Sequence, residues 1–248
     1  MRLVKAIDAR SAVLTGVAAV VVHFSRRRYL RWGATEEEVD IALPGDAILA
    51  PADLTATRAV TVHAAADDVW PWIAQLGQGR AGFYSYDFLE NMVGCNIHSA
   101  DRIVAEWQVI EVGDQVNLYP AVGLSVAHVE PGRALVLRGG LPMGPGRQPP
   151  YDFTWAFALN TGPGDTTRLI VRERYRYSRR WAALLIEPVS LISFVMSQRM
   201  LRGIRERAER QTSAARGRPV GDETVRELPR RHVFGGRNDV GSRVRIEY

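Results

Sequence analysis

The pattern of apolar and polar positions changes from alternating to helical between residues 58 and 76. Over residues 58–63 polar and apolar side chains alternate, with Val60 and Val62 on one face, which predicts a strand. Over residues 67–76 the apolar side chains recur at helical spacing, and Gly77 follows as a typical helix end. The sequence therefore predicts a strand that leads directly into an amphipathic helix.

A second, shorter helix is expected after a glycine-rich turn. Ser85 is in position to cap its N-terminus, and Gly94 is in position to end it. Phe88, Leu89 and Met92 fall on one side at helical spacing, so we expect that side to pack against the domain. Two short helices should therefore follow the first strand.

Residues 107–177 have the pattern of antiparallel strands separated by turn residues. The apolar segments are short, and Gly, Pro, Asn and Asp stand between them. We expect strands at Trp107–Ile110, Gln115–Leu118, Leu124–Val129, Ala134–Arg138, Tyr151–Leu159 and Thr167–Tyr177.

The last of these strands alternates between two different sides. One side carries Leu169 and Val171 together with Glu173 and Tyr175. The other side is basic and is expected to face solvent, as in an antiparallel sheet covered on one face only. Its basic residues are Arg172, Arg174 and Arg176.

The longest predicted helix spans Trp181–Gln211, with Pro188 expected to interrupt its beginning. Its apolar residues form one stripe at helical spacing, which requires an apolar partner surface. The stripe consists of Val189, Ile192, Met196, Met200 and Ile204.

The N-terminal segment, residues 1–33, is predicted to be an apolar and basic helix. Its apolar run, residues 12–24, is shorter than the roughly 20 residues that cross a bilayer, and Arg26, Arg27 and Arg28 follow it. Three interpretations remain open: a helix packed on the domain or lying at an interface, a short tilted membrane anchor, and an export signal. We expect a cytoplasmic protein that could contact an anionic membrane surface through residues 12–28.

The other domain boundaries follow from composition. Residues 34–56 have the character of a connector, and Thr35 and Glu38 have the spacing of a capping box. Residues 57–211 form the predicted domain. Residues 212–248 are polar, rich in Gly and Arg and weakly periodic, which predicts a disordered basic tail.

Charge and cysteine content limit the possible partners. The 248-residue chain has a formal net charge of +5, a sequence pI near 9.7 and a single cysteine, Cys95. One cysteine cannot form a disulfide within the chain, so nothing requires an oxidising compartment. The basic residues gather in the N-terminal segment, the last helix and the tail. The excess of arginine over lysine is what a high-GC genome would give, which is the favoured interpretation; the alternative is a basic surface near anionic lipid or nucleic acid. We expect no nucleic-acid partner.

Several common catalytic motifs are excluded. Residues 77–82 match GxGxxG, but a helix precedes them, whereas a dinucleotide site needs a strand before the glycines and a helix after them. The sequence has no GxSxG, P-loop, HExxH or paired CxxC motif, so hydrolase, NTPase and zinc-enzyme functions lack support. No cofactor and no metal site are expected.

The motifs of the chain resemble those of one superfamily. The strand–helix unit with Val69-Trp70-Pro71-Trp72 and the element order over residues 57–210 resemble the START-like, helix-grip superfamily, often called SRPBCC, which includes aromatase/cyclase-type and lipid-transfer proteins. Further motifs resemble a bacterial subgroup of it, at residues 32–35, 43–46, 77–82, 84–87 and 97–102. The resemblance implies an α+β fold: a curved antiparallel sheet wrapped around a long C-terminal helix, two short helices after the first strand, and an apolar cavity between sheet and helix.

The best polar cluster in the sequence contains His98 and Asp101. A histidine beside a carboxylate can act as a general base, with Asp101 orienting the ring. The alternative, which the sequence favours, is a structural loop held by Asp–Arg pairing and side-chain-to-backbone hydrogen bonds.

The residues expected to contact a ligand in the cavity are amphipathic aromatics and two flexible methionines. They are Trp72, Tyr84, Tyr86, Trp107, Trp155, Tyr175, Met196 and Met200. Ordinary core packing is the alternative for each of them.

The function expected first is the binding or carriage of a small apolar or lipid-like molecule in this cavity. The alternative is a cyclase- or dehydratase-type enzyme on the same fold, with His98 or a pocket tyrosine as the acid or base. A third possibility is a membrane-surface protein that acts through its basic termini. A closed apolar cavity without converging ionisable groups would favour the carrier, and a histidine or carboxylate that points into the cavity would favour the enzyme.

Overall fold

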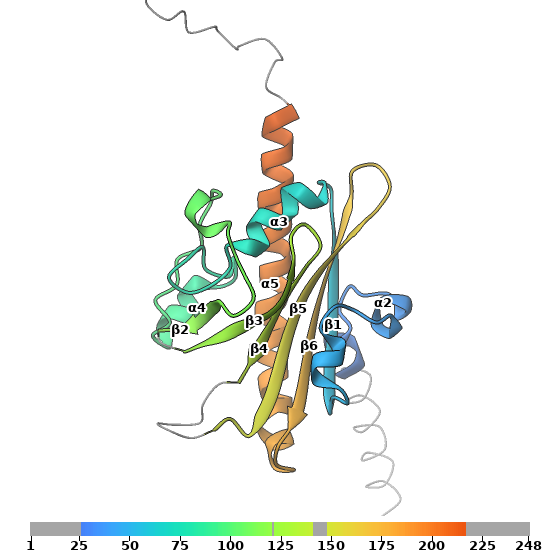
Figure 1. Ribbon diagram of the computed structural model, residues 1–248, viewed down its shortest axis with the longest axis vertical. Coiled ribbons are helices and arrows are strands. Elements are labelled where there is room, and N and C mark those ends of the chain that lie inside the picture. The colour runs from blue at the N-terminus through green and yellow to red at the C-terminus, as the bar shows by residue number, and fades with distance from the viewer. Residues whose placement is uncertain (1–25, 121, 141–147, 217–248) are drawn as a thin grey trace, which may run out of the picture.

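The computed structural model describes residues 26–120, 122–140 and 148–216. Within these ranges the chain forms a six-stranded antiparallel sheet with the strand order β1-β6-β5-β4-β3-β2. Figure 1 shows this sheet curving around one long helix, α5. The elements are α2 (Glu36–Asp40), η1 (Asp46–Leu49), β1 (Leu54–Val62), α3 (Ala66–Ala74), α4 (Asp87–Met92), η2 (Ala105–Trp107), β2 (Gln115–Tyr119), β3 (Val122–Glu130), β4 (Ala134–Gly139), β5 (Tyr151–Thr161), β6 (Thr167–Tyr177) and α5 (Ala182–Arg216).

This architecture confirms the predicted fold class. The chain is α+β, α3 and α4 follow the first strand, and the remaining strands form an antiparallel sheet whose inner face holds α5. The apolar run at residues 12–24 and the tail from residue 217 lie outside the described residues. Predictions about those two segments therefore stay predictions.

One predicted strand is wrong. Residues 105–107 form a short 3₁₀ helix, and the strand expected at Trp107–Ile110 is not formed. Side-chain hydrogen bonds hold this segment against α3, because Gln108 Nε2 donates to Gln75 Oε1 at 3.1 Å and Arg80 Nη2 donates to the Trp107 carbonyl at 2.5 Å. The segment is therefore bonded to a helix and its turn rather than to a neighbouring strand.

The expected interruption of the last helix at Pro188 is also wrong. Helix α5 begins at Ala182, continues through Pro188 and ends at Arg216, beyond residue 211 where the tail was expected to begin. A proline inside a helix removes one backbone hydrogen bond. Pro188 lies in an exposed part of α5, so water can bond to the carbonyl that it leaves without a donor.

The outer face of β1 and β6 is covered by the segment 36–49, so the predicted solvent exposure of Arg172 is wrong. This arginine is only 2% exposed. Its guanidinium pairs with Asp46 at 2.5 Å, and its other donors bond to the Thr57 hydroxyl and to backbone carbonyls of the covering segment. Those carbonyls belong to Glu38, Val39 and Ile41.

The segment 36–49 covers Arg174 and Arg176, on the same side of β6, to different extents. Arg174 bonds to the Leu49 carbonyl and lies 3.3 Å from Asp46, whereas Arg176 stays exposed. The capping box predicted at Thr35 is confirmed, and it starts the helix α2 that lies over this face. Of the residues expected to be a connector, 36–49 therefore form a second layer on the sheet, and 54–56 belong to β1 itself.

The glycines at 77–82 form a tight turn between α3 and the next segment. Gly77 and Gly82 exchange two backbone hydrogen bonds of 3.0 Å, and their φ angles are +133° and +68°. Such angles strain any residue with a side chain. The structure therefore confirms a turn rather than a nucleotide-binding loop here.

The C-terminal half of α5 completes the main core. Met200, Leu201 and Ile204 are buried among apolar side chains of the inner sheet face and of α3. Gly203 brings the helix close to the loop before α4, because an added Cβ would overlap the Tyr84 carbonyl oxygen. Close packing at this point requires the absence of a side chain.

We expect Arg172→Met to lower the free energy of unfolding by about 3 kcal/mol, because it leaves Asp46 and several backbone carbonyls without their cation. The matched control is Arg176→Met on the same side of β6, which should cost less than about 1 kcal/mol because Arg176 is exposed. Chemical denaturation of both variants measures the difference. Equal losses would show that the covering segment does not depend on Arg172.

We expect Gly203→Ala to destabilise the protein by about 1–3 kcal/mol through overpacking against Tyr84. Helix propensity alone predicts the opposite sign, a gain of about 1 kcal/mol. The exposed Ser213→Ala on the same helix is the control, and it should be neutral or slightly stabilising. Thermal unfolding of both variants measures the change in stability. If Gly203→Ala stabilises the protein, α5 does not approach the Tyr84 backbone as closely as described.

Candidate functional site

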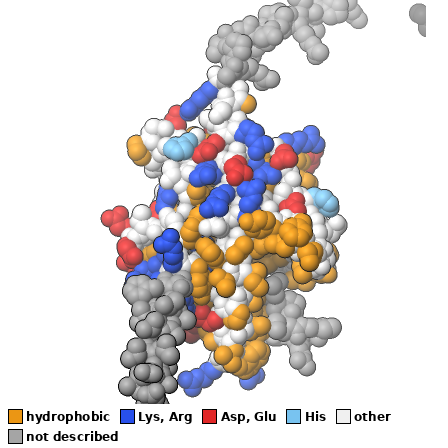
Figure 2. All heavy atoms as spheres, turned by 180° about the vertical axis from the view of Figure 1, so that it is seen from behind, with side chains coloured by type: hydrophobic (Ala, Val, Ile, Leu, Met, Phe, Trp, Pro, Cys, Tyr) orange, Lys and Arg blue, Asp and Glu red, His pale blue; other side chains and the backbone are white. Residues whose placement is uncertain are grey.

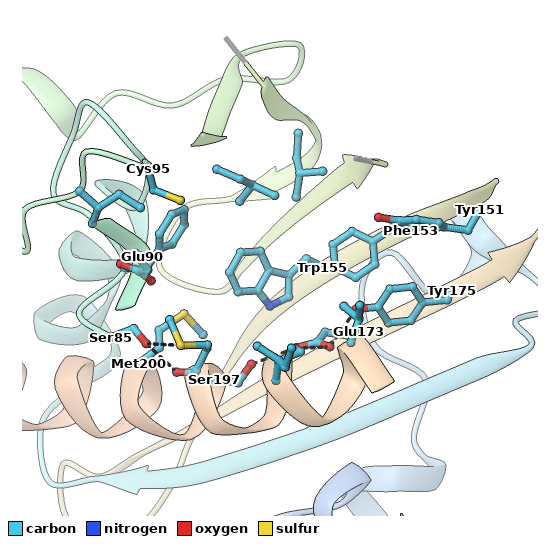
Figure 3. Close-up of a pocket in the computed structure, with 18 residues that line it drawn as sticks. Ser85, Glu90, Cys95, Tyr151, Phe153, Trp155, Glu173, Tyr175, Ser197 and Met200 are labelled. Atoms are coloured by element: carbon cyan, nitrogen blue, oxygen red, sulfur yellow. Dashed lines mark hydrogen bonds between the residues drawn. The ribbon is translucent and has the colours of Figure 1, made fainter. Parts of the chain in front are cut away.

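A cavity of about 300 Å³ lies between the inner face of the sheet and the N-terminal half of α5. Figure 3 shows strands on one side, α5 on the other, and α4 with its following loop at one end. The lining is mostly apolar. It consists of Phe83, Ser85, Glu90, Cys95, Ile97, Leu118, Leu124, Tyr151, Phe153, Trp155, Glu173, Tyr175, Val189, Ile192, Ser193, Met196, Ser197 and Met200.

The structure places half of the predicted ligand-contact residues in this lining. These are Trp155, Tyr175, Met196 and Met200. The residues placed elsewhere are Trp72, Tyr84, Tyr86 and Trp107. The methionines were found through the helical stripe of α5, and the two aromatics through the amphipathic character of their side chains.

Trp72 and Tyr84 are part of the main core. Their rings meet edge to face with centroids 5.8 Å apart. Gln75 Nε2 donates to the Tyr84 hydroxyl at 2.8 Å, and the Arg207 guanidinium lies over the same ring at 4.7 Å. Burial raises the pKa of Tyr84 well above its ordinary value, so its hydroxyl stays protonated. These contacts place both aromatics in the core, and Trp72 also borders a second pocket that Asp101 and Arg207 line.

Tyr86 and Trp107 lie at the edges of local structure. Tyr86 is the N-cap residue of α4 and is 38% exposed. Trp107 ends the short helix η2 and packs partly buried against the main core. The amphipathic aromatic character of a residue therefore did not show whether its side chain lines the cavity or packs in the core.

His98 and Asp101 lie outside the cavity lining. His98 is exposed, and among the described residues no hydrogen bond joins it to Asp101. The Asp101 carboxylate instead accepts a 2.8 Å hydrogen bond from Arg207 on α5, and Arg207 also donates to the Ala100 carbonyl. These contacts agree with a structural loop held by Asp–Arg pairing, which was the alternative to a general base at His98.

One end of the cavity is polar and tightly hydrogen-bonded. Arg58 on β1 pairs with Glu173 on β6 at 2.7 Å, and both side chains are almost completely buried. Arg58 Nε also donates to the Tyr29 carbonyl at 3.2 Å. In the register of β1 with β6, Ala56 stands directly opposite Glu173. Because the alanine side chain is small, Arg58, two residues further along β1, can reach Glu173 diagonally.

Hydroxyl groups complete the surroundings of Glu173. Ser193 and Ser197 on α5 donate to its carboxylate at 2.7 and 3.0 Å, and the Tyr175 hydroxyl donates at 3.2 Å. Burial and then the Glu173 charge raise the pKa of Tyr175 well above its ordinary value. Tyr175 is therefore a hydrogen-bond donor at neutral pH rather than a base.

The other end of the cavity holds a carboxylate without such partners. Figure 3 shows Glu90 at one end of the row of labelled side chains, with Trp155 between it and Tyr175. Burial and then the Asp87 charge raise the pKa of Glu90 to about 7. Its Oε2 is buried and has no hydrogen-bond partner within the described part of the chain. Burial likewise raises the pKa of the neighbouring Cys95 thiol, so that thiol is not ionised at neutral pH.

The orientation of α4 is opposite to the predicted one, and this brings Glu90 to the cavity. The side carrying Phe88 and Met92 was expected to be buried, but these residues are 65% and 74% exposed. Asp87 accepts two 2.6 Å hydrogen bonds from Ser99, and Asn91 bonds to the backbone of Ile97, so polar residues face the domain.

The N-cap predicted at Ser85 is also wrong. The Ser85 hydroxyl donates to the Met196 carbonyl on α5 at 3.1 Å, and Tyr86 is the N-cap residue. Sequence reasoning missed Glu90 because the apolar pattern of this helix assigned it to the outside. The usable signal was the polar side formed by Asp87, Glu90 and Asn91 at i, i+3 and i+4.

No family model matches the chain, and no curated protein sequence matches it. Among solved structures it is similar to a hypothetical protein from Helicobacter pylori, at 14% identity and a TM-score of 0.43 over 68% of this chain and 95% of that one. It is also similar to norcoclaurine synthase from Thalictrum flavum, at 14% identity and a TM-score of 0.42 over 64% and 96% of the two chains. A polyketide cyclase-like protein from Corynebacterium glutamicum matches at 13% identity and a TM-score of 0.37 over 68% and 99%.

At these identities and TM-scores the matches give no information about ligand, reaction or residue roles. The topology of the chain itself is more specific: one strand, two short helices, an antiparallel sheet in the order β1-β6-β5-β4-β3-β2 and a long last helix held by its inner face. By this topology the chain has an SRPBCC-like, helix-grip fold.

Proposed function

We propose that the protein binds a small, mostly apolar ligand in the cavity between the sheet and α5. The observation that carries this proposal is the cavity lining itself, in which aromatic, aliphatic and methionine side chains predominate over a few polar groups at the two ends. Ligand sites of this kind combine an apolar wall with few polar groups that fix orientation. A volume of about 300 Å³ suits a molecule at the small end of that class.

A second candidate is an acid/base reaction on a ligand in the same cavity. The observation that favours it is the Glu90 carboxyl in the lining, whose pKa is raised to about 7, because an acid or base works best when its pKa is near the working pH. The pocket tyrosine, Tyr175, already donates its hydrogen to Glu173 at 3.2 Å. His98, the other residue considered for such a reaction, lies outside the lining. The binding function remains the first proposal because the polar groups around Glu173 already bond to one another.

We further propose that the protein loads or releases its ligand at an anionic lipid surface. By length and composition alone, α5 is the one helix in the described part of the chain that could cross a membrane. Its C-terminal half is in the core, so we propose surface contact by its N-terminal half instead. Exposed apolar residues gather there and on α4: Phe88, Leu89, Met92, Val93, Trp181, Leu184, Val189, Leu191, Ile192 and Val195.

Two features support lipid as the partner of this apolar surface. Val189 and Ile192 belong both to the exposed surface and to the cavity lining, so the surface is continuous with the cavity. Exposed Arg179 and Arg180 directly precede it, and Figure 2 shows Lys and Arg side chains at the end of the apolar patch. Each basic residue near an anionic surface contributes about 1 kcal/mol of attraction.

The cavity is tested by filling it. We expect Met196→Trp to weaken the binding of an apolar fluorescent probe about tenfold or more, because the indole would occupy the cavity. The matched control is Met92→Trp, since Met92 is 74% exposed and lies outside the lining. Probe titration measures affinity, and circular dichroism confirms folding. Unchanged affinity in a folded Met196→Trp protein would refute the binding site.

The lipid surface is tested by flotation with liposomes of anionic and of neutral lipid. We expect the full chain to float with anionic liposomes, less so at high salt, and Leu184→Asp/Leu191→Asp to abolish flotation because these residues are 82% and 51% exposed. Ile41→Asp, 52% exposed on the covering segment, is the control.

A chain starting at Arg26 separates the two possible lipid contacts. It lacks the apolar run at residues 12–24 but keeps Tyr29, whose carbonyl bonds to Arg58. Flotation of this shortened chain would support the α5 surface. If it stays at the bottom while Leu184→Asp/Leu191→Asp of the full chain still floats, the contact belongs to residues 1–25 and the α5 proposal is wrong.

A further inference from the structure

Among the residues that the structure describes, those lining the cavity include two carboxylates and no basic side chain. Glu173 is neutralised from behind by Arg58 at 2.7 Å and receives hydrogen bonds from two serines. Glu90, at the other end, makes no ion pair within the described ranges. The charge of the cavity is therefore balanced at one end only.

Within the described ranges, the neighbours of Glu90 supply no positive charge, and the one unpartnered N–H donor in the cavity lining is Trp155 Nε1, which makes no hydrogen bond to Glu90. Asp87 on the same helix is itself acidic and accepts its hydrogen bonds from Ser99. Cys95 on the following loop has a raised pKa, and the Ser85 hydroxyl donates to a backbone carbonyl of α5. The lining residues that β2, β3 and α5 contribute near this end are apolar: Leu118, Leu124, Met196 and Met200.

A buried carboxylate oxygen without a partner is costly, because burial removes its water without a replacement. A ligand group that donates hydrogen bonds and carries positive charge would remove this cost. A protonated amine does both, since it has three N–H donors and a full charge. A neutral hydroxyl would leave the charge of the carboxylate uncompensated.

We propose that Glu90 binds a protonated amine at one end of the otherwise apolar ligand. This proposal rests on the binding function proposed above and names the class of ligand: an amphiphilic molecule with an apolar body that fits beside Trp155 and a basic group at the α4 end. Glu90 is then a binding residue that selects cationic over neutral and anionic ligands.

The proposal has a pH dependence with a defined sign. The pKa of Glu90 is raised to about 7, so the carboxylate ionises as the pH rises through 7. An aliphatic amine remains protonated up to a pH of about 10. Amine binding should therefore strengthen from pH 6 to pH 8, whereas binding of an uncharged ligand should not change.

The experiment uses three competitors with the same apolar body: decylamine, decanol and decanoate, each below its micellar concentration. Each displaces an uncharged apolar fluorescent probe from the full-length protein. We expect decylamine to bind about tenfold more tightly than decanol at pH 8, and decanoate to bind most weakly. Glu90→Gln should remove the advantage of decylamine and its pH dependence, while Glu106→Gln, an exposed glutamate outside the lining, should keep both.

Each other outcome overturns a specific part of the argument. If decanol binds as tightly as decylamine, or if Glu90→Gln keeps the preference, Glu90 does not select an amine, although the probe still reports the cavity. If decanoate binds best, the charge assignment of the cavity is wrong. If the probe itself does not bind to the unmodified protein, the proposed binding function fails, independently of Glu90.

Discussion

The buried ion pair between Arg58 and Glu173 is the interaction on which the arrangement of sheet, last helix and cavity depends. Two charges this deeply buried are stable only when further hydrogen bonds replace their water. The replacements come from three parts of the chain: the Tyr29 carbonyl, the hydroxyls of Ser193 and Ser197 on α5, and the Tyr175 hydroxyl. The pair therefore connects β1, β6, α5 and the segment before the covering layer, and it fixes the distance between helix and sheet at this point.

The cavity is a consequence of how α5 is held. Its C-terminal half is packed into the core through Met200 and Ile204, and its N-terminal half is attached through small serines to a carboxylate. Serines do not fill the space between helix and sheet as larger apolar residues would. Space remains beside the pair, and the apolar residues of this half of the helix line the cavity or face outward. The cavity and the proposed lipid contact thus have the same structural origin.

The two glutamates that line the cavity, Glu173 and Glu90, differ in their roles because their surroundings differ. Glu173 is paired and fully hydrogen-bonded, so it serves the structure. Glu90 reaches the cavity because Asp87 and Asn91 bond to the loop at residues 97–99 and turn α4 with its polar side inward. Its Oε2 is one of six buried side-chain atoms without a hydrogen-bond partner in the described part of the chain, and it is the carboxylate oxygen of that set that belongs to the cavity lining.

The sequence by itself determined the element order, most strands and the long last helix, because these depend on local periodicity. The fold class followed from the resemblance of that order and of the motifs to the helix-grip superfamily. The sequence also placed Glu173 and Tyr175 on the inner side of β6, and Met196 and Met200 on the inner stripe of α5. Only the tertiary structure decided which charges meet. Arg172 is buried because a segment more than 120 residues earlier in the chain covers it, at Asp46. Glu90 faces inward because hydrogen bonds to another loop outweigh the apolar side of a six-residue helix. Both outcomes depend on contacts between distant segments, which periodicity along the chain does not contain.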